Sequence, residues 1–111
     1  MEYIKILIAK DFSKTPGPRY KKEGSFSAEL FLEQILEKKF TDILEKKDKK
    51  IIIDLDGTLG YGTSFLEETF GGLARKYGAD KVSEKIEVAS KEEPWLLEDI
   101  KSYIEDVKKQ S

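Results

Sequence analysis

Three consecutive isoleucines at positions 51–53 run directly into Asp54-Leu55-Asp56, and Gly57 closes the run. Bulky β-branched side chains favour extended backbone. A strand exposed on one face alternates apolar with polar residues, whereas a continuous apolar run is typical of a strand buried on both faces of a parallel sheet. The sequence therefore predicts a buried strand here, with two carboxyl groups where the strand ends.

The segments on either side complete an alternating pattern. Strands are predicted at residues 3–9 and 82–89, the second half-exposed at a sheet edge. Helices are predicted after Ser27, after Ser64 and from Pro94, because apolar residues recur at helical spacing in each segment. Residues 11–24 are rich in Pro, Gly and charge and are expected to form a loop. The order β-α-β-α-β-α predicts an α/β fold, a largely parallel sheet packed by helices, in a single domain spanning residues 1–111.

Composition narrows the chemistry open to such a domain. The net charge is −2, so no overall field attracts nucleic acid or an anionic membrane. The chain contains no Cys and no His, which removes disulfides, thiolates and the usual general base and metal ligand. We therefore expect no cofactor and no bound metal. Neither a spanning segment nor a signal peptide is evident, and a soluble cytoplasmic protein is expected.

The segment 51–59, Ile-Ile-Ile-Asp-Leu-Asp-Gly-Thr-Leu, resembles the opening motif of the haloacid-dehalogenase-like phosphatases. That resemblance implies Asp54 as nucleophile, Asp56 as acid/base, a magnesium ion beside both, and Ser90 as a phosphate-binding hydroxyl. The family also carries a lysine motif and a later acidic pair, for which Asp80 and the acidic residues at 98–99 are poor substitutes. A small magnesium-dependent phosphohydrolase is thus one hypothesis.

A second resemblance covers the longer segment 54–68. It is similar to the STAS fold of anti-sigma-factor antagonists, in which a central strand leads through a turn into an Asp-Ser-Ser-Gly-Leu signature at a helix start. This alignment places Thr63 on the Ser that a partner kinase phosphorylates and Ser64 on its neighbour. It therefore implies that Thr63 and Ser64 are candidate phospho-acceptors. Gly62 and Phe65 depart from the signature, where the antagonists have Asp and Gly.

The chain also resembles a STAS-like family of unknown function found in bacteria and archaea. Four motifs of that family occur here in order, at residues 12–20, 24–27, 54–57 and 64–68. The resemblance implies a non-enzymatic protein-interaction module of a regulatory switch, whose partner is an anti-sigma factor or a histidine-kinase-like ATPase. The implied binding surface is the turn after the central strand and the following helix start, comprising Asp56, Gly57, Tyr61, Gly62, Thr63, Ser64, Phe65, Glu67 and Glu68.

Most of these residues also have simpler structural interpretations. Ser64 and Glu67 are spaced as a capping box, and the carboxylates of Asp54 and Asp56 can accept hydrogen bonds from loop N–H groups. Arg19 is expected to anchor its loop through a carboxylate. The Gly71-Gly72 pair suggests close approach of another backbone. A third hypothesis is a structural domain that forms a homodimer by pairing its edge strand at 82–89.

Overall fold

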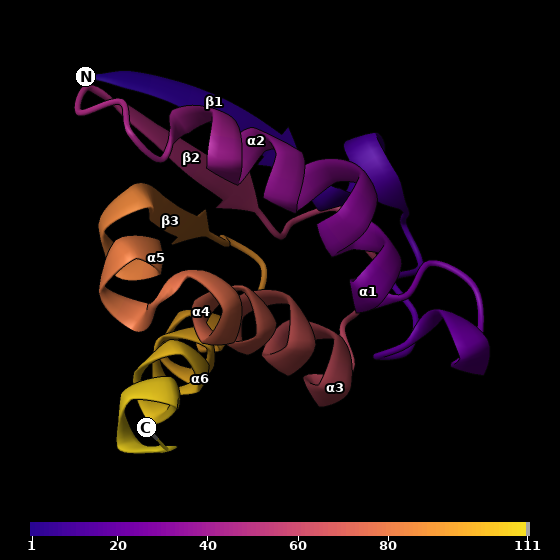
Figure 1. Cartoon of the computed structure of the whole chain (residues 1–111). Helices are drawn as coiled ribbons and strands as arrows, with labels where there is room; N and C mark the ends of the chain where they lie inside the picture. The colour runs from indigo at the N-terminus through magenta and orange to yellow at the C-terminus, as the bar shows by residue number, and fades with distance from the viewer. Residues whose placement is uncertain (111) are drawn as a thin grey trace.

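Strand β2, Lys49–Asp54, lies at the centre of a three-stranded parallel sheet in the computed structural model, which describes residues 1–110 (Figure 1). It pairs on one side with β1, Glu2–Leu7, and on the other with β3, Ile86–Ala89. In this register Ile4, Ile51 and Ile86 stand side by side. The predicted α/β class, with its parallel sheet packed by helices, is confirmed.

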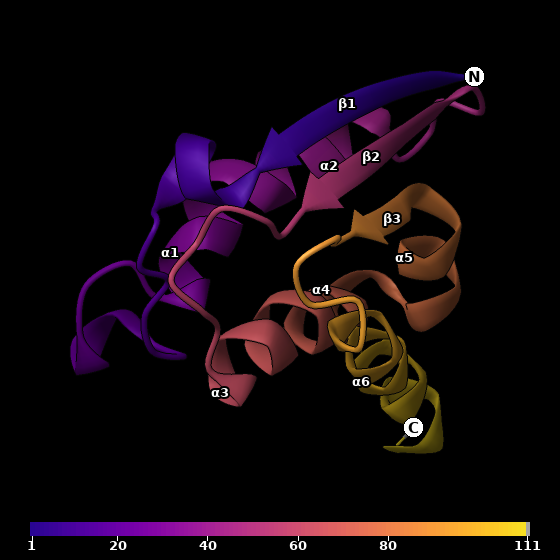
Figure 2. The same cartoon turned by 180° about the vertical axis from the view of Figure 1, so that it is seen from behind.

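Helices cover one face of this sheet. The helix of residues 28–43 joins β1 to β2, and the helices of residues 63–85 join β2 to β3. Each connection moves one strand further across the sheet in the same direction. Because parallel strands are joined by right-handed crossovers, both helical connections lie on the same face of the sheet. The opposite face carries no helix (Figure 2). Ile51 and Ile53 are fully buried whereas Ile52 is partly exposed, so burial of β2 on both faces was a wrong prediction.

Two long helices are built from consecutive short elements with a π-helical turn in the middle of each. A final helix, α6 (Leu96–Gln110), packs against the π-helical turn η4 (Glu67–Gly71) and against α5 (Ala79–Lys85). The bounds are α1 Ala28–Phe31, η3 Leu32–Leu36 and α2 Glu37–Ile43 for the first; α3 Thr63–Leu66, η4 Glu67–Gly71 and α4 Gly72–Tyr77 for the second; then α5 Ala79–Lys85 and α6 Leu96–Gln110.

Local sequence signals account for several of these boundaries. The buried Ser27 side chain accepts a hydrogen bond from the Leu30 N–H at 3.1 Å, which caps α1 as predicted. Gly78 ends α4 with a φ of 104°, a conformation that favours glycine. The core beneath the sheet contains four fully buried phenylalanines, Phe31, Phe40, Phe65 and Phe70.

Two predicted strands are shorter than the sequence indicated. The first ends at Leu7, where the chain turns into η1, Ile8–Phe12, and the Asp11 carboxylate accepts the Leu7 N–H at 2.8 Å. Residues 79–85 form α5 rather than the start of the edge strand. Val82 and Ile86 are both buried and lie four residues apart, a spacing that suits a helix as well as a strand.

Candidate functional site

The loop of residues 55–62 connects the central strand to α3, and hydrogen bonds hold it at several points. The Leu55 N–H donates to the Ala89 carbonyl at 2.9 Å, and the Leu59 N–H donates to the Lys14 carbonyl at 2.8 Å. The Tyr61 hydroxyl donates back to the Leu55 carbonyl at 2.7 Å. These contacts attach the 55–62 loop to the end of β3 and to the loop after η1, so its backbone conformation is well determined.

The Asp56 carboxylate organises the loop that follows β3. It accepts hydrogen bonds from the Ser90 hydroxyl at 2.9 Å, the Lys91 N–H at 2.9 Å and the Glu92 N–H at 3.1 Å. The Gly57 N–H donates in return to the Glu92 carboxylate at 2.6 Å. The hydrogen bonds from the Lys91 and Glu92 backbone lower the pKa of Asp56 below its ordinary value. The ionised Asp56 carboxylate therefore holds the 55–62 loop against the loop that follows β3.

Asp54 is also engaged within the chain. One of its oxygens accepts the Asp56 N–H at 2.9 Å, and the other lies 3.8 Å from the Lys5 ammonium. Ser90, which the phosphatase resemblance places on substrate, instead bridges Asp56 and the Glu93 N–H. Within residues 1–110, no group of three His, Cys, Asp or Glu side chains is placed to hold a metal ion. The two carboxylates thus have structural partners that explain their positions.

Both candidate phospho-acceptors lie on the surface where α3 begins. Thr63 is the first residue of α3 and Ser64 the second, and both are exposed. The N-cap residue is Gly62, and no side chain caps this helix. The predicted capping box of Ser64 with Glu67 is therefore wrong, because the helix starts two residues earlier than predicted and the Glu67 carboxylate points to arginines instead.

Phe65 must be removed from the predicted binding surface. It is 0% exposed, and its ring packs against Phe31 and Phe12 with centroids 6.1 Å and 6.2 Å away. Tyr61 is half-buried, with its ring centroid 6.0 Å from that of Phe65, and burial raises the pKa of the Tyr61 hydroxyl above its ordinary range. Phe65 follows Ser64 directly, but the helix turns its side chain inward. Its ring therefore lies in the core, not on the binding surface.

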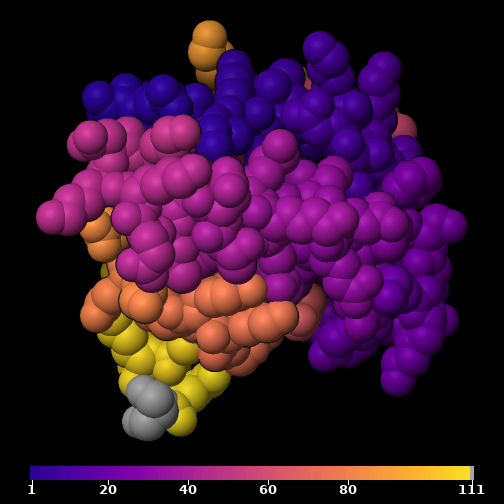
Figure 3. All heavy atoms as spheres, turned by 45° about the horizontal axis from the view of Figure 1, so that its top comes forward, coloured from indigo at the N-terminus to yellow at the C-terminus, as the bar shows by residue number. Residues whose placement is uncertain are grey.

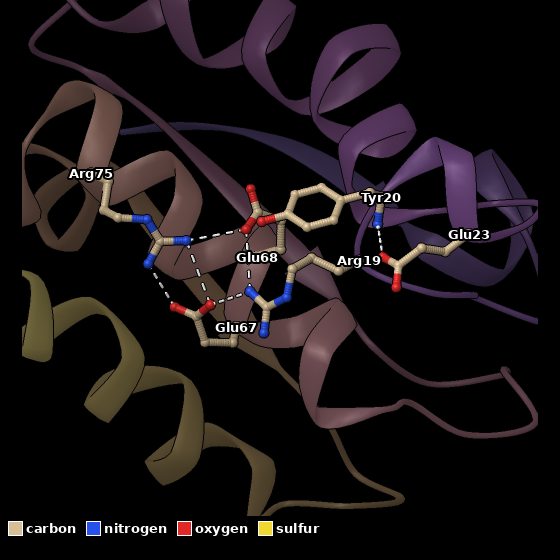
Figure 4. Close-up of polar contacts among 6 residues, drawn as sticks. All are labelled: Arg19, Tyr20, Glu23, Glu67, Glu68 and Arg75. Atoms are coloured by element: carbon tan, nitrogen blue, oxygen red, sulfur yellow. Dashed lines mark hydrogen bonds and ion pairs between the residues drawn. The ribbon is translucent and has the colours of Figure 1, made fainter.

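Arg19 reaches across from its loop to the helix of residues 63–77 (Figure 4). Its guanidinium donates to the carboxylates of Glu67 and, at 3.2 Å, Glu68. Arg75 approaches the same two carboxylates from the other side, 2.7 Å from Glu67 and 3.2 Å from Glu68. Burial raises the pKa of Glu67, but the hydrogen bonds from Arg75 and Arg19 outweigh burial and lower it below its ordinary value. We call these four residues the arginine–glutamate cluster.

The Gly71-Gly72 pair makes room for this cluster. A Cβ atom on Gly71 would collide with the Glu67 carboxylate, and one on Gly72 would lie 3.0 Å from the Glu68 carboxylate. The two glutamates stand four residues before the two glycines, so each folds back over a glycine of the next turn. The predicted approach of another backbone is wrong: side-chain carboxylates fill the space. Arg75 is not among the residues predicted from the sequence, although the spacing Glu67, Gly71, Arg75 places all three on one helix face.

The fold and the site together define an α/β domain that presents an ordered loop and a helix start beyond the carboxyl end of its central parallel strand. Residues 27–94 match the model of a STAS-like domain of unknown function, which is more than half of the chain. The chain belongs to this family. The match includes β2, the 55–62 loop and the helix of residues 63–77. No curated protein and no solved structure matches the chain, and within residues 1–110 no helix is long and apolar enough to span a bilayer.

Proposed function

We propose that this domain is a protein-interaction module of a regulatory switch, and that it binds an anti-sigma factor or a histidine-kinase-like ATPase. The observation that carries the proposal is Leu59, whose side chain is 86% exposed on the 55–62 loop. A single exposed leucine is common on protein surfaces. Here, however, the Leu59 N–H is itself hydrogen-bonded, so a constrained backbone presents the apolar side chain. A constrained loop loses little conformational entropy when a partner covers it.

The proposed binding surface consists of the exposed residues of the 55–62 loop together with Thr63 and Ser64. A phosphate on either hydroxyl would add a charge of about −1.5 to −2 where the partner docks. Glu67 and Glu68 lie in the same helix, but both are ion-paired with Arg19 and Arg75. Their repulsion of a phosphate is therefore partly neutralised, and the domain can accept the modification while its surface charge changes.

The test is direct binding to purified partners. The histidine-kinase-like ATPases and anti-sigma factors of the host are titrated with this domain by isothermal titration calorimetry. We expect at least one to bind, and Leu59→Ser to weaken that binding at least tenfold. Tyr20→Ser is the matched control, because Tyr20 is also an exposed large apolar side chain but lies in the loop before α1, outside the proposed surface. Failure of every candidate to bind, or equal weakening by both substitutions, would overturn the proposal.

A further inference from the structure

The outer edge of β1 has unpaired backbone groups. The Glu2 N–H donates to the Asp48 carbonyl at 2.7 Å, so the backbone of Glu2 faces β2. Alternate residues of a parallel strand face the same neighbour, and the backbone groups of Tyr3 and Lys5 therefore point away from β2. No strand within residues 1–110 pairs with this side. The open edge ends at Leu7, because the Leu7 N–H already donates to the Asp11 carboxylate.

A groove of about 430 Å³ runs beside this edge, between β1 and the helix of residues 28–43. Figure 3 shows the two elements next to each other on one face, with no other segment laid over them. The groove combines an open strand edge with a helical wall, a shape suited to an extended chain. Its lining residues are Lys5, Asp11, Gln34, Ile35, Lys38 and Lys39.

The groove is positively charged, since three lysines line it against one aspartate. Lys38 and Lys39 are both exposed, and neither forms an ion pair within the part of the chain that the structure describes. Lysines on other parts of the sheet differ: Lys49 pairs with Glu2 at 3.1 Å, and Lys50 pairs with Glu87 at 3.6 Å. Lys5 lies 3.8 Å from the Asp54 carboxylate, so the positive charge of the groove that no ion pair neutralises is that of Lys38 and Lys39.

We propose that an extended acidic segment of a partner protein adds to β1 as a further strand. Its backbone pairs with the outward N–H and carbonyl groups of Tyr3 and Lys5, the usual basis of affinity in strand addition. Successive side chains of a strand point to opposite faces. Acidic side chains on one face of the segment meet Lys38 and Lys39, and side chains on the other face lie along the uncovered sheet surface beside Tyr3, which is 46% exposed.

The charge of the groove argues against two other occupants. A second copy of this chain would offer its own β1, whose one acidic side chain, Glu2, already pairs with Lys49 at 3.1 Å and is not available to Lys38 and Lys39. A nucleic acid would satisfy the lysines, but it has no extended peptide backbone to pair with Tyr3 and Lys5. This surface lies on β1 and α2, so the inference is independent of the loop-based binding proposed above.

The experiment titrates the whole ¹⁵N-labelled protein with the peptide acetyl-Thr-Glu-Val-Glu-Val-Glu-Thr-amide. We expect the largest NMR shift changes at the N–H groups of Tyr3 and Lys5, and binding that weakens as salt rises. The double variant Lys38→Glu/Lys39→Glu should weaken binding at least tenfold. Lys81→Glu/Lys101→Glu makes the same charge change elsewhere and should bind as the original protein does. The same peptide N-methylated at both valines and at the glutamate between them should lose binding whichever set of N–H groups faces β1, and this probe leaves the protein unchanged.

Each alternative result contradicts a definite part of the proposal. Equal binding by both double variants would show that the groove lysines do not recognise the peptide. Undiminished binding of the N-methylated peptide would show ion pairing without strand addition. Shift changes centred on Ile86–Ala89 would place the added strand on the other sheet edge. Displacement of the peptide by an oligouridylate of equal charge would identify a phosphate-binding surface instead.

Discussion

Arg19 and Glu67 are 48 positions apart in the chain, and the ion pair between them ties the loop before α1 to the helix of residues 63–77. We expect Arg19→Met to lower the free energy of unfolding by about 1 kcal/mol, the upper range for a partly exposed pair. The amides of Ala28 and Glu29, which donate to loop carbonyls, should then exchange with solvent faster. Hydrogen exchange measures this, with Lys14→Met as the control in the same loop. Unchanged exchange in Arg19→Met would show that the pair does not hold the loop.

The pH dependence of stability should report on Glu67. Its pKa in the folded protein lies below the ordinary value of 4.5. A lowered folded-state pKa means that the ionised form stabilises the fold, fully above about pH 4.5, and that this stabilisation disappears as the pH falls through the folded-state pKa. Glu67→Gln should therefore melt at a lower temperature than the original protein at pH 7, and the difference should shrink in acid. A difference that stays constant from pH 7 to pH 3 would contradict this.

The two helix-start serines should behave differently in denaturant melts. Ser27→Ala removes a buried cap and should cost about 1 kcal/mol. Ser64→Ala removes an exposed hydroxyl that caps nothing and should change stability by less than about 0.5 kcal/mol. Each variant is the control for the other. Equal losses would show that Ser64 caps its helix in solution, contrary to the observed start at Thr63.

The carboxylates at the end of β2 should not support phosphate chemistry. We expect no turnover of p-nitrophenyl phosphate with Mg²⁺, because Asp56 is occupied by hydrogen bonds from Ser90 and two backbone N–H groups. Turnover is followed by release of p-nitrophenol. Activity that disappears in Asp54→Asn would support the phosphohydrolase hypothesis instead.

Charge at the start of α3 should weaken partner binding without unfolding the domain. We expect Thr63→Glu and Ser64→Asp each to reduce affinity at least tenfold, about 1.4 kcal/mol, because each places a negative charge on the proposed surface. Calorimetry with one partner at one salt concentration measures the affinity, and a thermal melt checks the fold. Lys101→Glu on α6 is the distant control. If all three variants bind equally, the start of α3 is not the interface.

Some predictions made from local sequence signals are confirmed, and others are wrong. The isoleucine run and Ser27 each act within a few residues, so the central strand and the start of the first helix followed from the sequence alone. The strand prediction for residues 82–85 is wrong because a spacing of four residues fits both a helix and an alternating strand. The prediction that Ser64 caps its helix is wrong because a helix start can move by two residues without changing the apolar pattern.

The sequence by itself determined the α/β class, the parallel central strand and the family, because apolar periodicity and local motifs encode these features. Only the tertiary structure decided which carboxylates face which partners. Asp56 accepts hydrogen bonds from residues 34 to 36 positions further along the chain, and Arg19 pairs with Glu67, which is 48 positions away. Such pairs depend on how the crossovers stack beside the sheet, and no spacing along the chain encodes the distance between two side chains brought together in this way.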